Sequence, residues 1–262
     1  MTNKTEAVPH PAATVTLVRD APGGLEVLLL ERSKSLRFMP GAFVFPGGAL
    51  DPGDSAPGLQ ALCVGQKDVA ASRVLGLERG GLAYWIAAIR EAFEEAGILL
   101  AYDGEGRLIE LNGTAGERFR KHRQLLDGGR HGEFGDVLRT EGLRLATDRL
   151  RYFGHWITPV TVPRRYDTRF FLAIVPPHQE ASPDRTETVS HVWLAPRDAL
   201  EQRERLGLRF PTIKTLERIA GCATVADAVA EVVASPAVRP LLPRITRDGR
   251  TLLPGEPGYD EA

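Results

Sequence analysis

The stretch 83–96 constrains the fold more than any other part of the sequence. It contains no Pro or Gly, and Gly97 follows at the position where helix ends favour glycine. We therefore expect a helix. At 100° per residue, its large apolar side chains gather on one side, which must face a core. These residues are Trp85, Ile86, Ile89, Phe93 and Ala96.

Three glutamates occupy the other side of this helix. Glu91, Glu94 and Glu95 fall within one arc of about 100°. Taken alone, they are most simply interpreted as a solvated acidic face. Like charges at this spacing repel by a few tenths of a kcal/mol per pair, roughly. A divalent cation would turn that repulsion into binding, because hard ions prefer oxygen ligands.

The remaining elements alternate irregularly between strands and helices, which predicts mixed α/β layers around one sheet. Strands are expected at 13–18, 25–31, 98–102, 152–162, 169–175 and 189–194. Further helices are expected at 67–77, 115–139, 211–220 and 225–234. The proline-rich tail beyond residue 236 is expected to form a loosely packed arm.

Composition excludes several classes of protein. The 33 basic and 34 acidic residues leave a net charge of −1, which argues against general nucleic-acid binding. Only Cys63 and Cys222 are present, far apart and in no metal-ligand spacing, so a disulfide framework, a zinc site and a C-x-x-C redox centre are unsupported. No stretch reaches the ~18 apolar residues of a membrane span, and the first residues lack the apolar core of a signal peptide. We expect a cytoplasmic protein with a small-molecule substrate and no membrane partner.

Residues 90–98 (REAFEEAGI) and 48–54 (GALDPGD) together resemble the signature of the Nudix hydrolase family, G-x5-E-x7-R-E-U-x-E-E-x-G-U, where U is a bulky aliphatic residue. Ala92 is a small residue at the first U, and Asp54 stands where the family has Glu. Between Asp54 and Arg90 lie 35 residues instead of seven, an insertion of 28.

The resemblance implies an α/β fold, an α/β/α sandwich on a mixed β-sheet with a helical insertion inside the signature. We expect one domain over 12–234, with insertions at about 55–82 and 104–148 and a C-terminal arm over 235–262. Nudix relatives often form dimers, so a homodimer stays open.

The resemblance also implies a metal site for Mg²⁺ or Mn²⁺. Its ligands would be the carboxylates of Glu91, Glu94 and Glu95 and the carbonyl of Gly47. Arg90 would hold the carboxylates in place without touching substrate. Whether Asp54 supports the site as the usual Glu does stays open. Glu187 lies just before a strand, where several Nudix enzymes carry a general base or an extra ligand; an ordinary exposed Glu is the alternative.

Residues 28–48 resemble the motif of the coenzyme A diphosphatase branch, LLTxR[SA]x3Rx3Gx3FPGG, with Leu30 in place of Thr. The resemblance implies that Arg32 and Arg37 bind substrate, because guanidinium forks suit the phosphates of coenzyme A. Residues 152–159 and 165–171 resemble the long-insert subfamily called nucleoside diphosphate-linked moiety X motif 19.

Within these two segments, Arg165 and Arg169 are further candidates for contacting phosphate, with a plain surface role as the alternative. Trp156, Tyr166, Phe170 and Phe171 are most simply interpreted as sheet core, and His155 shows no partner in the sequence.

The function implied is metal-dependent hydrolysis of the diphosphate of coenzyme A or acyl-CoA. The products would be adenosine 3′,5′-bisphosphate and (acyl-)4′-phosphopantetheine. Metal and a carboxylate, Glu91 or Glu187, would activate the attacking water. Two alternatives stay open. One is a Nudix diphosphatase for a nucleotide sugar, NADH, a dinucleoside polyphosphate or an RNA cap; the other is a non-catalytic Nudix-like ligand sensor.

Overall fold

The structure is a computed structural model that describes residues 7–126, 133–234 and 237–261. Its centre is a mixed sheet of seven strands in the order β3-β2-β1-β8-β7, with β4 beside β1 and β9 beside β2. The strands are β1 (His10–Ala21), β2 (Gly24–Arg32), β3 (Phe43–Val44), β4 (Gly47–Ala49), β7 (Arg151–Ile157), β8 (Tyr166–Ile174) and β9 (Thr188–Leu194).

Strand β1 organises this sheet. One of its edges pairs in parallel with β8 from His10 to Val18. Its other edge is shared by two antiparallel strands, β4 at Ala12–Thr14 and β2 at Val18–Ala21. The change of partner leaves a gap between β2 and β4. The chain that crosses this gap, residues 33–46, can therefore form the wall of a cavity.

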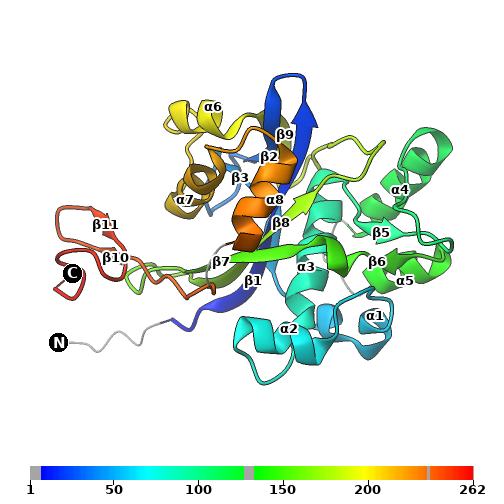
Figure 1. Ribbon diagram of the computed structural model, residues 1–262, viewed down its shortest axis with the longest axis horizontal. Coiled ribbons are helices and arrows are strands. Elements are labelled where there is room, and N and C mark those ends of the chain that lie inside the picture. Colours follow the sequence, from blue (N-terminus) through cyan, green and yellow to red (C-terminus); the bar gives the residue numbers. More distant parts are fainter. Residues whose placement is uncertain (1–6, 127–132, 235–236, 262) are drawn as a thin grey trace.

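Helices cover both faces of the sheet, as the sandwich expectation requires. One face carries α3 (Leu82–Ala96), with α1 (Pro57–Gln60), α2 (Asp68–Leu75), α4 (Gly113–Leu126) and α5 (Phe134–Thr140) around it. The other carries α6 (Pro196–Glu201), α7 (Phe210–Ile219) and α8 (Val225–Ala234) (Figure 1). Each face has its own apolar core. The α/β/α fold class is thus confirmed.

Helix α3 begins and ends where the sequence predicts. Gly97 ends it in the left-handed conformation with φ of 71°, which glycine adopts without strain. The helix has no solvated acidic side, which is the simplest interpretation of the three glutamates taken alone, because every residue of α3 is buried. The neighbouring short helices and α4 cover the side that the sheet leaves open.

The insertion inside the signature packs as part of this cover. It follows the 3₁₀ turn η1 (Pro52–Ser55), which contains Asp54 of the signature, and it includes α1 and α2. Leu59, Ala71 and Leu75 are buried in the same core as α3. Residues 55–82 are all described, and none of them lines the cavity discussed below. The insertion supports α3 from outside and forms no lid.

Smaller elements complete the chain. They are β5 (Ala101–Tyr102), which is shorter than the expected strand, β6 (Arg144–Leu145), the 3₁₀ turn η3 (Thr147–Arg149), β10 (Arg244–Ile245) and β11 (Thr251–Leu252). Residues 127–132 of the expected 104–148 excursion, and 235–236 and 262 of the expected arm, lie outside the described residues.

The described part of the arm is less loose than expected. The backbone of Leu241 exchanges two hydrogen bonds of 2.9 Å with His155 and Ile157, which adds a short segment beside β7. A hairpin of β10 and β11 follows. Among the described residues, no helix is both long enough and apolar enough to cross a membrane.

The contact between α3 and β8 gives a test of the packing. Phe171 is fully buried, and its ring lies edge-on to Trp85 with 4.7 Å between ring centroids. We expect Phe171→Ala to lower the free energy of unfolding by about 3–5 kcal/mol. The matched control is Ile174→Ala on the same strand, where the side chain is 48% exposed. Denaturant unfolding measures both; equal losses would contradict this packing.

Candidate active site

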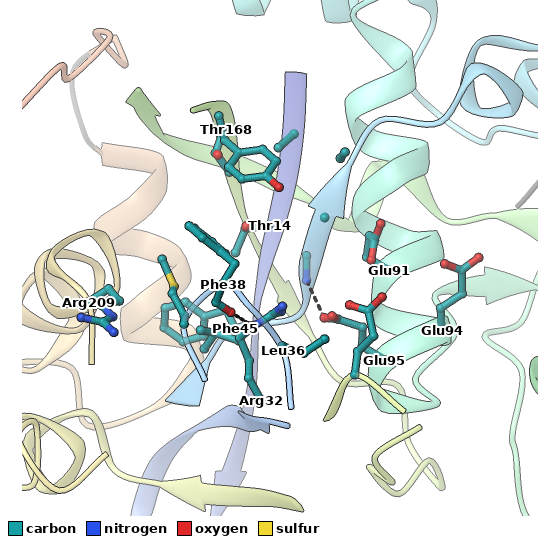
Figure 2. Close-up of a pocket in the computed structure, with 18 of the residues that line it drawn as sticks. Thr14, Arg32, Leu36, Phe38, Phe45, Glu91, Glu94, Glu95, Thr168 and Arg209 are labelled. Atoms are coloured by element: carbon teal, nitrogen blue, oxygen red, sulfur yellow. Dashed lines mark hydrogen bonds between the residues drawn. The ribbon is translucent and has the colours of Figure 1, made fainter. Parts of the chain in front are cut away.

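A cavity of about 990 Å³ opens between α3, the sheet and the start of α7. Glu91, Glu94 and Glu95 line it from α3. Figure 2 shows these carboxylates on one side and Arg209 on the opposite side. Side chains of the 32–45 segment lie between the two sides. The cavity therefore has an acidic wall and a basic wall, with apolar surface between them.

The buried side chain of Arg90 holds the acidic wall, which consists of Glu91, Glu94 and Glu95, in place. It is 1% exposed, and its Nε and Nη2 donate to the Asp54 carboxylate at 2.9 and 3.0 Å. Nη1 donates to Glu91 Oε1 at 2.8 Å and to Glu94 Oε2 at 2.9 Å. Nη2 also donates to the carbonyl of Ala49. One guanidinium thus fixes two of the three glutamates and joins them to β4 and to η1.

The same contacts answer the question that the sequence leaves open about Asp54. This carboxylate is buried, binds Arg90, and is not among the residues that line the cavity. Burial acts to lower the pKa of Arg90, but the charges of Glu91, Asp54 and Glu94 outweigh it and hold that pKa above its usual value. Arg90 therefore stays charged, and Asp54 acts on the acidic wall through it.

Two glycines of β4 let this strand approach α3 closely. The Gly47 N–H donates to Glu95 Oε2 at 2.9 Å. A Cβ atom at Gly48 would come within 2.4 Å of Glu91 Oε1, and one at Gly47 within 2.5 Å of the Ala13 carbonyl oxygen. Glycine at position 48 therefore leaves room for the Glu91 carboxylate, and glycine at position 47 lets β4 lie against the backbone of β1.

Burial dominates the electrostatics of the acidic wall. It raises the pKa of the Glu91 carboxyl to about 7; Arg90 acts against this shift and Glu94 adds to it. Burial also holds the pKa of Glu95 well above its usual range, helped by the charge of Glu91 and opposed by the Gly47 N–H. In their ionised forms, Glu91 and Glu95 therefore have too little positive charge around them, and an added cation would stabilise these forms.

The donor set fits a hard divalent cation in type and in charge, since three carboxylates face one cavity. The side-chain positions are not those of a formed centre. Within the described part of the chain, no group of three or more His, Cys, Asp or Glu side chains is gathered closely enough to hold a metal ion. Arg90 bonds one oxygen each of Glu91 and Glu94 and so holds them toward itself.

The segments on either side of the acidic wall bring in Arg32, Arg37 and Glu187, all of which line the cavity. Arg32 Nε donates to the Phe38 carbonyl at 3.2 Å, and its positive charge acts to lower the pKa of Glu95. Glu187 lies just before β9, as expected, and its carbonyl accepts from the N–H of Ser33 at 2.8 Å. The structure thus brings these three residues together with the glutamates of α3.

Arg165 does not join them. It is buried, its Nε donates to the Thr158 carbonyl at 3.0 Å, and its Nη1 donates to the Ala7 carbonyl at 2.8 Å. It is not among the residues that line the cavity. This side chain thus holds the amino-terminal segment to the loop before β8, and the expected phosphate contact is not supported.

The side chain of Arg169 also points away from the cavity. Alternation along β8 points its neighbours Thr168 and Phe170 into the cavity and sends Arg169 to the other face. There it is buried, and it contacts Asp167 and His155. His155, which shows no partner in the sequence, also hydrogen-bonds Asp167. The phosphate role expected of Arg169 is therefore replaced by a buried polar cluster.

Several side chains of the cavity escape sequence reasoning. Trp156 and Phe170 are buried as expected, yet they also line the cavity. Strand alternation could have indicated Phe170 once the facing side was known. Phe45 belongs to the motif over 28–48, and Tyr166 lies in the segment 165–171, but neither signal indicates a cavity. Phe38, Arg164 and Arg209 carry no local signal, because distant segments bring them to the cavity.

Comparison with known proteins agrees with this geometry. Residues 77–219 match the family model described as the NUDT19 Nudix domain. The chain is 31% identical to the acyl-coenzyme A diphosphatase NUDT19 of Xenopus laevis over 206 residues, covering 67% of this chain and 54% of that protein. Identity to the human protein of the same name is 31% over 244 residues, covering 78% and 63%. The chain thus spans about half to two thirds of these relatives.

A solved structure gives a matching fold. The crystal structure of a NUDIX hydrolase from Alicyclobacillus acidocaldarius superimposes with a TM-score of 0.71 at 30% sequence identity. The match covers 88% of this chain and 99% of that one. Most of the described elements therefore have counterparts in a single known structure.

The Arg90–Asp54 pair gives a prediction about stability. Asp54→Ala leaves a buried guanidinium without its bidentate partner, so we expect the free energy of unfolding to fall by about 3–5 kcal/mol. The control is Asp136→Ala, which removes an ion pair between Asp136 and Arg139 whose side chains are both more than half exposed. That loss should stay below about 1 kcal/mol. Similar losses in chemical denaturation would show that the buried pair is not special.

The raised pKa of Glu91 gives a prediction about pH. The folded chain holds this proton more tightly than the unfolded chain, so protonated Glu91 stabilises the fold below pH 4.5, and that contribution is lost as the pH rises to about 7. The Glu91→Gln variant has no such proton and therefore no such pH-dependent contribution to lose. In metal-free buffer, its stability relative to wild type should therefore rise from pH 4.5 to about 7 and then level off. Glu117→Gln, at an exposed site on α4, should show no such trend. A stability difference between Glu91→Gln and the wild type that does not change with pH would contradict the raised pKa of Glu91.

Proposed function

We propose that this chain, which belongs to the Nudix hydrolase family and resembles its NUDT19 Nudix domain, hydrolyses the diphosphate of coenzyme A or acyl-CoA. The products are adenosine 3′,5′-bisphosphate and (acyl-)4′-phosphopantetheine. The names of the relatives support this substrate class, and so does the match of residues 28–48 to the coenzyme A diphosphatase motif.

One observation carries the proposal. The carboxylates of Glu91, Glu94 and Glu95 face a cavity that Arg32 and Arg37 also line. A diphosphate needs both kinds of group, because a cation held by carboxylates and guanidinium forks can neutralise its oxygens together. Arg32 acts electrostatically on Glu95, which supports a place for it beside the scissile diphosphate.

Nudix hydrolases generally use divalent metal ions. Here Glu91, Glu94 and Glu95, with the carbonyl of Gly47, would hold Mg²⁺ or Mn²⁺. When bound, the ion would neutralise the diphosphate oxygens, orient a water molecule and stabilise the leaving phosphate. Arg90, whose side chain is 1% exposed, would hold one oxygen each of Glu91 and Glu94 in place and would not touch substrate.

Side chains of the protein accept the proton of the attacking water and orient the substrate. As the water oxygen bonds to one phosphorus, its proton passes to a carboxylate, and the bridging P–O bond breaks with its electron pair on the leaving phosphate. Glu91 or Glu187 accepts the proton, since both line the cavity. Arg32 and Arg37 orient the substrate phosphates.

The decisive experiment incubates the purified protein with coenzyme A and Mg²⁺ or Mn²⁺ and resolves the products by liquid chromatography and mass spectrometry. We expect both proposed products, and a chelator should abolish them. Glu94→Gln keeps an oxygen that can accept from Arg90 but loses the charge, so kcat/KM should fall on the order of 100-fold or more. Glu117→Gln should keep full activity, and melting curves of both variants check folding.

Other outcomes would overturn parts of the proposal. Intact coenzyme A with turnover of a nucleotide sugar, NADH, a dinucleoside polyphosphate or capped RNA would remove the substrate and leave the chemistry. Binding of these compounds without turnover of any would identify a ligand sensor. Full activity of Glu94→Gln with Mg²⁺ would remove the metal assignment.

A further inference from the structure

Arg209 faces the cavity from the wall opposite the carboxylates (Figure 2). It is the residue that precedes α7, with an extended backbone of φ −92° and ψ 158°, and Pro211 restricts the first turn of that helix. The Arg209 carbonyl accepts from the Ile213 N–H at 2.9 Å, which joins its backbone to the first turn of α7, and its side chain is exposed at the cavity.

The Arg209 guanidinium is also uncommitted. Within residues 7–126, 133–234 and 237–261, its side chain has no hydrogen-bond or ion-pair partner. Two other arginines of the cavity, Arg90 and Arg32, are engaged, because Arg90 is bound to three carboxylates and Arg32 donates to a backbone carbonyl. Among the described residues, Arg37 is as free as Arg209, and Arg164 lies over the ring of Tyr166. A free fork on a cavity wall is suited to a planar bidentate anion such as a phosphate.

The surface between the two walls is aromatic. Phe38 and Phe45 lie between the acidic wall and Arg209 (Figure 2), and Trp156 and Phe170 also line the cavity. Such side chains offer flat apolar area to a base or a sugar. A ligand with its diphosphate at the carboxylates and its nucleoside on this surface would bring any further anionic group on the nucleoside toward Arg209.

We propose that Arg209 determines substrate specificity by binding a second phosphate, a phosphomonoester on the nucleoside half of the substrate. The inference rests on the proposed function, under which this group is the 3′-phosphate of coenzyme A. The arginines then have separate roles, since Arg32, beside Glu95, serves the scissile diphosphate, and Arg209 distinguishes a nucleoside bisphosphate from a plain nucleotide. The phosphomonoester is the better fit than a carboxylate of an acyl group, because it carries more charge and every acyl-CoA contains it.

The test compares coenzyme A with 3′-dephospho-coenzyme A, which differs only in this phosphate. In the wild type we expect kcat/KM to be about 10- to 100-fold higher for coenzyme A, the range of one charge-assisted contact at an exposed site. Arg209→Ala should lose that advantage, mainly through KM, and should leave dephospho-coenzyme A unchanged. Arg209→Lys keeps the charge without the fork and should recover part of the loss.

The matched control is Arg203→Ala. Arg203 is another exposed arginine shortly before α7, and it does not line the cavity. Its replacement should affect neither substrate. Because Arg209 is exposed, the Arg209→Ala chain should melt at the wild-type temperature, so a kinetic change cannot be ascribed to unfolding.

Three results would overturn the inference while the proposed function stands: an equal loss on both substrates, no loss on either, or a loss confined to an acyl-CoA with a terminal carboxylate such as succinyl-CoA. If the wild type cleaves neither compound, the proposed function fails. Calorimetry then still decides on Arg209. Adenosine 3′,5′-bisphosphate should bind the wild type more tightly than adenosine 5′-monophosphate, and Arg209→Ala should remove that difference; an unchanged difference would contradict the assignment.

Discussion

The rest of the site depends on the ion pairs that the buried guanidinium of Arg90 makes. A charge that is 1% exposed is tolerable only when its donors are satisfied, and here Asp54, Glu91 and Glu94 share it. Because the charge of Arg90 compensates those of Glu91 and Glu94, α3 can carry acidic side chains although the whole helix is buried. Glu95 has a different partner, the Gly47 N–H, and this bond fastens β4 to the same wall.

The same contact explains how the signature survives a long insertion. The chain leaves the signature at Asp54 and returns to it in α3, and the Asp54–Arg90 ion pair joins the two points directly. The intervening η1, α1 and α2 add apolar cover to α3 and do not line the cavity. A long connection whose ends are already fixed changes little at the site, because the entropy of loop closure grows only slowly with length.

Much of the fold could be predicted from local signals. The length of α3, its glycine end and the shared arc of the glutamates follow from helix periodicity, and the β1–β2 pair follows from its turn. Burial of Glu91, Glu94 and Glu95 could not be predicted, because the covering segments are distant in sequence. The sides taken by Arg165 and Arg169 depend on strand faces that no motif records. The position of Arg209 across the cavity has no local signal at all.

We propose that one cavity holds both the metal and the diphosphate of coenzyme A. The most direct measurement is a crystal structure with Mn²⁺ and a coenzyme A analogue whose bridging oxygen is replaced by a methylene group. Anomalous scattering then locates the ion independently of any assumption about its ligands. The account predicts a peak beside Glu91, Glu94 and Glu95, with the phosphonate groups of the analogue next to it in the same cavity. A peak elsewhere, or an analogue bound outside this cavity, would contradict it.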